Sequence, residues 1–168
     1  MVIGMTILIE CVALCLLFTV VVATVSLKDP LAGVHSWPPA IQQRAREMGL
    51  IREQQMAGSK GVAMKKLAAA LLFAAIFAAV VYFVNGARSF AAGFGISYLI
   101  WTVVNWYDAI VIDCLWICHD KRVRIPGTED MKAYQDYWFH IRASLRGQVI
   151  GLPIALVAGG LTEVLACL

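Results

Sequence analysis

The sequence is poor in charged residues and rich in apolar ones. Only 15% of its 168 residues are charged, whereas 61% are hydrophobic. Soluble globular domains carry about 25% charged residues, so these proportions exclude an ordinary soluble enzyme and an intrinsically disordered chain. The composition predicts an integral membrane protein.

Motifs that would indicate a known chemistry are also missing. The sequence has no nucleophile in a G-x-S-x-G turn, no glycine pattern that would bind phosphate, and no C-x-x-C pair. Its basic residues are not interleaved with aromatic ones in the manner of a nucleic-acid interface, so nucleic acid is not an expected partner. No cofactor is predicted.

Four apolar stretches are long enough to cross a membrane as helices: about 2–27, 66–86, 89–119 and 148–168. A membrane-spanning helix needs about 20 apolar residues, and these stretches have no polar face that would mark a soluble helix. The first stretch could instead be a cleaved signal peptide, but no Lys or Arg precedes it and Glu10 interrupts it. We therefore expect a single all-α membrane domain over residues 1–168.

Basic residues predict the orientation of this domain. Seven Lys and Arg residues lie in 28–66 and six in 120–147, which leaves only Arg88 for the turn between the second and third stretches. By the positive-inside rule, the long loops 28–65 and 120–147 are cytoplasmic, and both termini are outside, in a plasma membrane of bacterial type. The lipid bilayer is the expected partner.

Each long loop has an amphipathic pattern. After Pro38 and Pro39, an apolar stripe follows helical spacing, and a second stripe follows the turn at Pro126 and Gly127. The first stripe comprises Ile41, Ala45, Met48, Ile51 and Met56, and the second comprises Met131, Tyr134, Trp138, Ile141 and Leu145. We expect two cytoplasmic helices that lie in the membrane interface, with a gate or docking platform as the alternative.

Four carboxylates fall inside the apolar stretches: Glu10, Asp108, Asp113 and Glu163. Beyond Lys66 at the border of the second stretch, these stretches contain no Lys or Arg. A charged side chain at the centre of a membrane helix costs about 2.5–3.5 kcal/mol on insertion scales. Each carboxylate must therefore be protonated, hydrated, bonded to polar side chains or occupied by a cation.

The third stretch carries a polar and aromatic stripe. Asn105, Asp108 and His119 share a face at helical spacing, and Asp113 is expected to point to the side of that face. The stripe predicts a hydrated path or a binding site. Hydrogen bonding between helices is the alternative, because Asn and Asp often serve that purpose in membranes.

Cysteine and histidine give a weaker signal. The five cysteines are an odd number, so they cannot all pair within the chain. Cys118 and His119, with His140 in the next loop, offer a weak alternative as a metal site, but no metal site is predicted. Small residues such as Gly93, Ala155 and Gly159 favour close helix packing and permit self-association.

Three classes of function fit these features. We favour transport or permeation of a proton, cation or small solute by a homo-oligomer, with a path through the polar residues of the spans: Glu10, Asn105, Asp108, Asp113, His119 and Glu163. An enzyme at the cytoplasmic interface, with Asp113 and His119 as catalytic residues, is the alternative. A scaffold or accessory subunit is the third.

Overall fold

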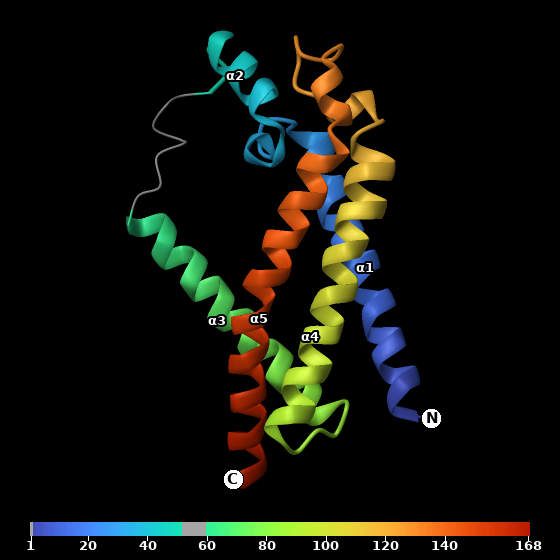
Figure 1. Cartoon of the computed structure of the whole chain (residues 1–168), viewed down its shortest axis with the longest axis vertical. Helices are drawn as coiled ribbons and strands as arrows, with labels where there is room; N and C mark the ends of the chain where they lie inside the picture. The colour runs from blue at the N-terminus through green and yellow to red at the C-terminus, as the bar shows by residue number, and fades with distance from the viewer. Residues whose placement is uncertain (1, 52–59) are drawn as a thin grey trace. The chain divides into compact units, whose positions relative to one another are not determined.

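The computed structural model describes residues 2–51 and 60–168, and helices make up almost all of its regular structure. The long elements are α1 (Val2–Lys28), α3 (Lys60–Phe83), α4 (Phe90–Tyr107) and α5 (Tyr137–Cys167), and α2 (Pro39–Glu47) is shorter (Figure 1). Short 3-10 turns η1 (Val34–Ser36), η4 (Lys121–Val123) and η5 (Lys132–Gln135) lie in the connections. The described residues include no strand, so the all-α prediction is confirmed.

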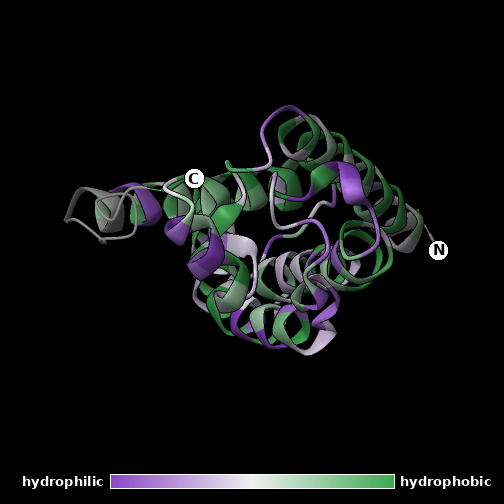
Figure 2. Ribbon diagram, turned by 90° about the horizontal axis from the view of Figure 1, so that it is seen from above, coloured by the Kyte–Doolittle hydropathy of each residue, from purple (hydrophilic) through white to green (hydrophobic). Residues whose placement is uncertain are grey.

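Four helices are long and apolar enough to span a membrane: Gly4–Lys28, Met64–Phe83, Phe90–Ile117 and Tyr137–Cys167. Their ribbons are predominantly hydrophobic, whereas hydrophilic residues concentrate in the connections (Figure 2). Many of their large side chains are exposed in the single chain, among them Leu16, Leu72 and Val149 at 60%, 61% and 71%. Such apolar surface is typical of helices surrounded by lipid.

The fourth span begins earlier than the sequence pattern indicated. α5 starts at Tyr137 and continues to Cys167, so the apolar stripe expected in a separate loop helix lies partly in η5 and partly in the first turns of α5. The carboxylate of Asp136 accepts a hydrogen bond from the backbone N–H of Phe139 (3.0 Å), which is the N-cap arrangement. This cap fixes the start of the helix.

The helix in the first loop is shorter than its apolar stripe. Pro39 occupies its first turn, as the two prolines predicted, and the helix ends at Glu47. Gly49 follows with a φ of 71°, and the backbone N–H of Leu50 bonds to the carbonyl of Ala45 (3.0 Å). A glycine in this left-handed conformation terminates a helix. Met56, the last member of the predicted stripe, lies outside the described residues.

The chain forms two compact units, each built from separated segments. Unit 1 comprises the described residues of Met1–Leu14, Gly58–Asn105 and Leu145–Leu168, and unit 2 those of Cys15–Ala57 and Trp106–Ser144. Each unit therefore combines residues that are distant in the sequence.

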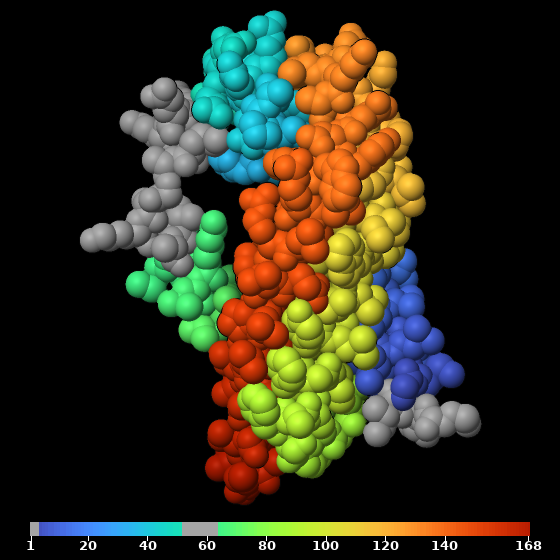
Figure 3. Space-filling view, in the orientation of Figure 1, coloured from blue at the N-terminus to red at the C-terminus, as the bar shows by residue number. Residues whose placement is uncertain are grey.

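In unit 1, α4 and α5 pack closely because α5 presents a stripe of small residues. Gly147, Gly151, Ala155 and Gly159 recur every fourth residue, and the last three are buried. A Cβ at Gly151 would overlap the indole of Trp101, and one at Gly159 would lie 2.9 Å from the carbonyl oxygen of Phe90. These small residues therefore allow α4 and α5 to approach closely within unit 1. The two helices touch in the space-filling view (Figure 3).

Unit 2 has its own apolar core, to which both long loops contribute. Ile41 and Ala45 of α2 are fully buried with Val123, Ile125 and Tyr134 of the second loop. Trp37 packs edge-on against Tyr134, with ring centroids 4.6 Å apart. The apolar residues of α2 thus face protein, and α2 and the second loop touch in Figure 3. Trp138 is 68% exposed and lies outside this core.

The third span changes its helical geometry inside unit 2. After Tyr107 the chain continues as a π-helix, η3 (Asp108–Ile117), in which each N–H bonds five residues back. The backbone N–H of Cys118 still bonds to the carbonyl of Asp113 (2.9 Å) at its end. A π-helix has more residues per turn than an α-helix, so residues i and i+5 lie closer to one face of it than they do on an α-helix.

Candidate functional site

Unit 2 contains a cavity of about 300 Å³. Its lining combines three titratable side chains with aromatic, small and aliphatic residues from α1, the first loop, η3, η4 and α5. The titratable residues are Asp108, Asp113 and His140, and the others are Phe18, Val22, Val25, Ser26, Pro30, Gly33, Ser36, Trp37, Ile117 and Val123. No Lys or Arg is among these lining residues. We call this space the acidic cavity.

Asp113 and His140 form a hydrogen-bonded pair at the acidic cavity. The Nδ1 atom of His140 lies 3.0 Å from Oδ2 of Asp113, close enough to donate a hydrogen bond. His140 is 3% exposed, whereas the side chain of Asp113 is 24% exposed. The imidazole is therefore held in place by a carboxylate that itself stays accessible.

The other nitrogen of His140 is closed off from solvent. Nε2 is buried and forms no hydrogen bond with any residue that the structure describes. Cys118, which is fully buried, also interacts with this imidazole. Cys118 does not line the acidic cavity, so its thiol is not placed to attack a molecule bound there.

Asp108 is the carboxylate without a bonded partner. Its side chain forms no hydrogen bond or ion pair within residues 2–51 and 60–168, although it is close enough to Asp113 and His140 to interact with them electrostatically. Its neighbour Asp113 is of the same charge, and the lining offers no basic side chain except the imidazole. Among the lining residues, only the imidazole of His140 can offset a negative charge on Asp108, so a proton or a cation that enters the cavity would stabilise this carboxylate.

The π-helix explains why these two carboxylates share a cavity. On a regular α-helix, residues five apart are separated by about 140° around the axis, which is the reason that Asp113 was expected to point to the side of the face that carries Asp108. That expectation is wrong, because both side chains line the acidic cavity. Wider turns between Asp108 and Ile117 bring the positions i and i+5 onto one face.

The other residues of the predicted path lie elsewhere. Asn105 donates a hydrogen bond to Oε1 of Gln148 (3.1 Å) between α4 and α5 in unit 1, and Gln148 in turn donates to Thr102 (2.5 Å). Also in unit 1, Glu10 accepts a hydrogen bond from Nδ2 of Asn85 (3.0 Å). Asn105 thus connects two helices, which is the alternative that the sequence left open.

Glu163 and His119 are both exposed and do not line the acidic cavity. His119 instead makes a hydrogen bond through Nε2 with the hydroxyl of Tyr137 (3.0 Å). The weak alternative of a metal site at Cys118, His119 and His140 is not assembled, because no cluster of three or more metal-binding side chains occurs in the described part of the chain.

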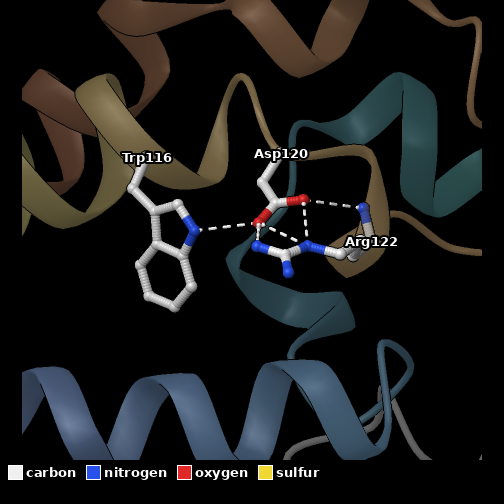
Figure 4. Close-up of polar contacts among 3 residues, drawn as sticks. All are labelled: Trp116, Asp120 and Arg122. Carbon is white, nitrogen blue, oxygen red and sulfur yellow. Dashed lines mark hydrogen bonds and ion pairs between the residues drawn. The ribbon is translucent and has the colours of Figure 1, made fainter.

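A second polar cluster follows the third span. Asp120 bonds to the guanidinium and backbone N–H of Arg122, with the closest ion-pair distance 2.8 Å, and accepts a hydrogen bond from the indole of Trp116 (3.0 Å; Figure 4). The hydrogen bonds from Arg122 hold the pKa of Asp120 well below its usual range. This cluster closes the turn after η3 and uses no residue of the acidic cavity.

Arg124 and Tyr134 fix the remainder of this loop. The guanidinium of Arg124 donates to the carbonyl of Cys118 (3.1 Å) and to that of Glu129, and its carbon lies 4.8 Å from the centre of the Tyr134 ring. The loop is therefore tied to the end of η3 on one side and to the core of unit 2 on the other.

Trp37, Tyr134 and His140 shape the site, although little in the sequence distinguishes them. His140 gave one signal in the sequence, since it is one of only three histidines. Its carboxylate partner, however, lies 27 positions away, and no periodic pattern links such distant positions.

Comparison of the chain with protein-family models, with curated proteins and with solved structures finds no match.

Proposed function

We propose that this chain is a membrane transport protein in which Asp108 exchanges a proton for a cationic solute. The observation that carries the proposal is the isolation of the Asp108 carboxylate at a cavity without Lys or Arg. Ionisable groups within membrane helices are costly, so such a group commonly marks an ion or substrate pathway.

The charge of the cavity supports a cationic solute. With His140 protonated, the two carboxylates leave one net negative charge, and with His140 neutral they leave two. In either state a cation or a proton on Asp108 reduces the electrostatic repulsion from Asp113. Because both compete for one carboxylate, binding of the cation releases the proton, and this competition couples the two movements.

The enzyme alternative receives less support from the geometry. A general base must reach the proton that it abstracts, within hydrogen-bonding distance or through one water molecule. Nε2 of His140 is buried, and His119 lies on the surface beside Tyr137. Asp113 is accessible, but its Oδ2 atom is already hydrogen-bonded to Nδ1 of His140. Asp113 and His140 therefore serve the proposal as a fixed hydrogen-bonded pair next to Asp108.

The test is proton flux in vesicles that contain the reconstituted protein and a pH-sensitive dye. We expect Asp108→Asn to reduce cation-driven proton flux at least about tenfold, and the matched change Asp130→Asn, at a side chain 98% exposed, to leave it unchanged. Full flux in Asp108→Asn would remove this residue from the mechanism. Asp108→Leu separates folding from function: because the Asp108 side chain forms no hydrogen bond within the described residues, this variant should lose flux and keep the wild-type melting temperature. A loss of about 0.6–2 kcal/mol of stability, the cost of a hydrogen bond between membrane helices, would instead indicate a structural role.

Orientation is part of the same proposal. If the positive-inside rule applies, cysteine-accessibility labelling should place 28–65 and 120–147 in the cytoplasm. Self-association is also proposed, since one chain of this size leaves little room for an enclosed path. Because the small residues of α5 pack against α4, the contacts between copies would use other helix faces.

A further inference from the structure

We infer that the solute bound in the acidic cavity is a small organic monocation that carries an apolar or aromatic group. This inference rests on the proposed function for its use of Asp108, and it names the chemical class of the ligand. Three properties support it: the volume of the cavity, its charge and the chemistry of its wall.

The volume of the acidic cavity sets the size of the guest. About 300 Å³ is at the lower end of the range of ligand sites in proteins. A guest of this size has on the order of ten non-hydrogen atoms, so peptides and lipids are too large. A bare metal ion would leave most of the space to water, against a wall that is largely apolar.

The donor set of the wall also favours an organic cation. Divalent cations such as Ca²⁺ take about six to eight oxygen ligands. The lining of the acidic cavity includes two acidic residues and two serines, Ser26 and Ser36, and no metal-binding cluster of three or more side chains occurs among the described residues. An alkylammonium group, by contrast, needs only one carboxylate and a surface of low polarity.

Aromatic side chains complete the match. Trp37 and Phe18 both line the acidic cavity, and an aromatic ring attracts a cation through the negative charge of its face. Trp37 is held by Tyr134 at 4.6 Å and lies 6.4 Å from the ring of His140, both edge-on. The Trp37 part of the wall is therefore held in place before the ligand arrives, which reduces the entropy lost on binding.

The probe for this inference is benzyltrimethylammonium, whose charge is permanent and which does not cross lipid as a neutral base. Calorimetric titration of the purified protein in detergent should show binding that weakens as the pH falls, because protons compete for Asp108. Asp108→Asn should raise the Kd at least about tenfold, the equivalent of 1.4 kcal/mol. Asp130→Asn should leave it unchanged. Tetramethylammonium, which lacks the ring, should bind more weakly, and 3-phenylpropionate, which is an anion, should not compete.

Each outcome addresses one proposal. If Na⁺ binds and depends on Asp108 while benzyltrimethylammonium does not bind, the organic ligand class is wrong and cation transport stands. If the probe binds and depends on Asp108 but vesicle flux does not, transport is wrong and the ligand class stands. If benzyltrimethylammonium binds equally well to Asp108→Asn and wild type, while melting temperatures show both to be folded, the inference is overturned.

Discussion

The hydroxyl of Tyr134 provides the sharpest test of the core of unit 2. Tyr134 is fully buried, and its hydroxyl oxygen accepts a hydrogen bond from the backbone N–H of Ile125 (3.0 Å). Thr128 donates its own hydroxyl proton to the carbonyl of Ile125 (2.7 Å). In the contact between the two hydroxyls (2.7 Å), Tyr134 is therefore the donor.

Tyr134→Phe removes both bonds and leaves the buried N–H of Ile125 without a partner. An unsatisfied buried donor costs about 1–3 kcal/mol, so we expect the free energy of unfolding to fall by about 2 kcal/mol. For a chain of this length, 1 kcal/mol corresponds to about 2–4 °C, which predicts a decrease in Tm of about 4–8 °C. Thermal unfolding in detergent micelles measures this change.

Tyr137→Phe is the matched control, because Tyr137 is 42% exposed and, among the described residues, its hydroxyl forms a hydrogen bond with the exposed His119 alone. Its effect should stay within about 0.5 kcal/mol, as is usual for surface changes. A double-mutant cycle with Thr128→Val should give a coupling energy of at least about 0.5 kcal/mol. Equal effects of the two Tyr→Phe changes would refute the hydrogen-bond network and its buried setting.

Two further predictions concern pH and packing. The lowered pKa of Asp120 means that its ionised form is favoured in the folded state. The stabilising effect of this carboxylate is therefore present above the unfolded pKa of about 3.9 and is lost as the pH falls through the lower folded pKa. Asp120→Asn should make the Tm less dependent on acid pH. Gly151→Ala should destabilise unit 1 by about 1–3 kcal/mol because its methyl group meets Trp101, whereas Gly160→Ala, where a Cβ meets open space, should be neutral or stabilising by up to about 1 kcal/mol. Similar Tm values for the two alanine variants would contradict the close packing of α4 and α5.

The positions of the four apolar helices followed from the sequence, because length and hydrophobicity are local properties of a segment. Pro39 likewise predicted the start of α2. The bounds were less well predicted at α5, where the cap at Asp136 starts the helix eleven residues before the expected position of 148. Polar residues in the first three turns of α5, such as His140, Arg142 and Arg146, hide the start of the helix from a count of apolar residues.

The composition of the acidic cavity was decided by tertiary structure. The sequence identified Asp108 as an unpaired carboxylate, since no basic residue lies near it in the third stretch. It could not place Asp113 beside it, because α-helical spacing was assumed and the π-helix changes the angle between them. Nor could it bring His140 to Asp113 or Trp37 to the cavity wall, because these contacts join segments that are distant in the chain and depend on how loops and helices pack.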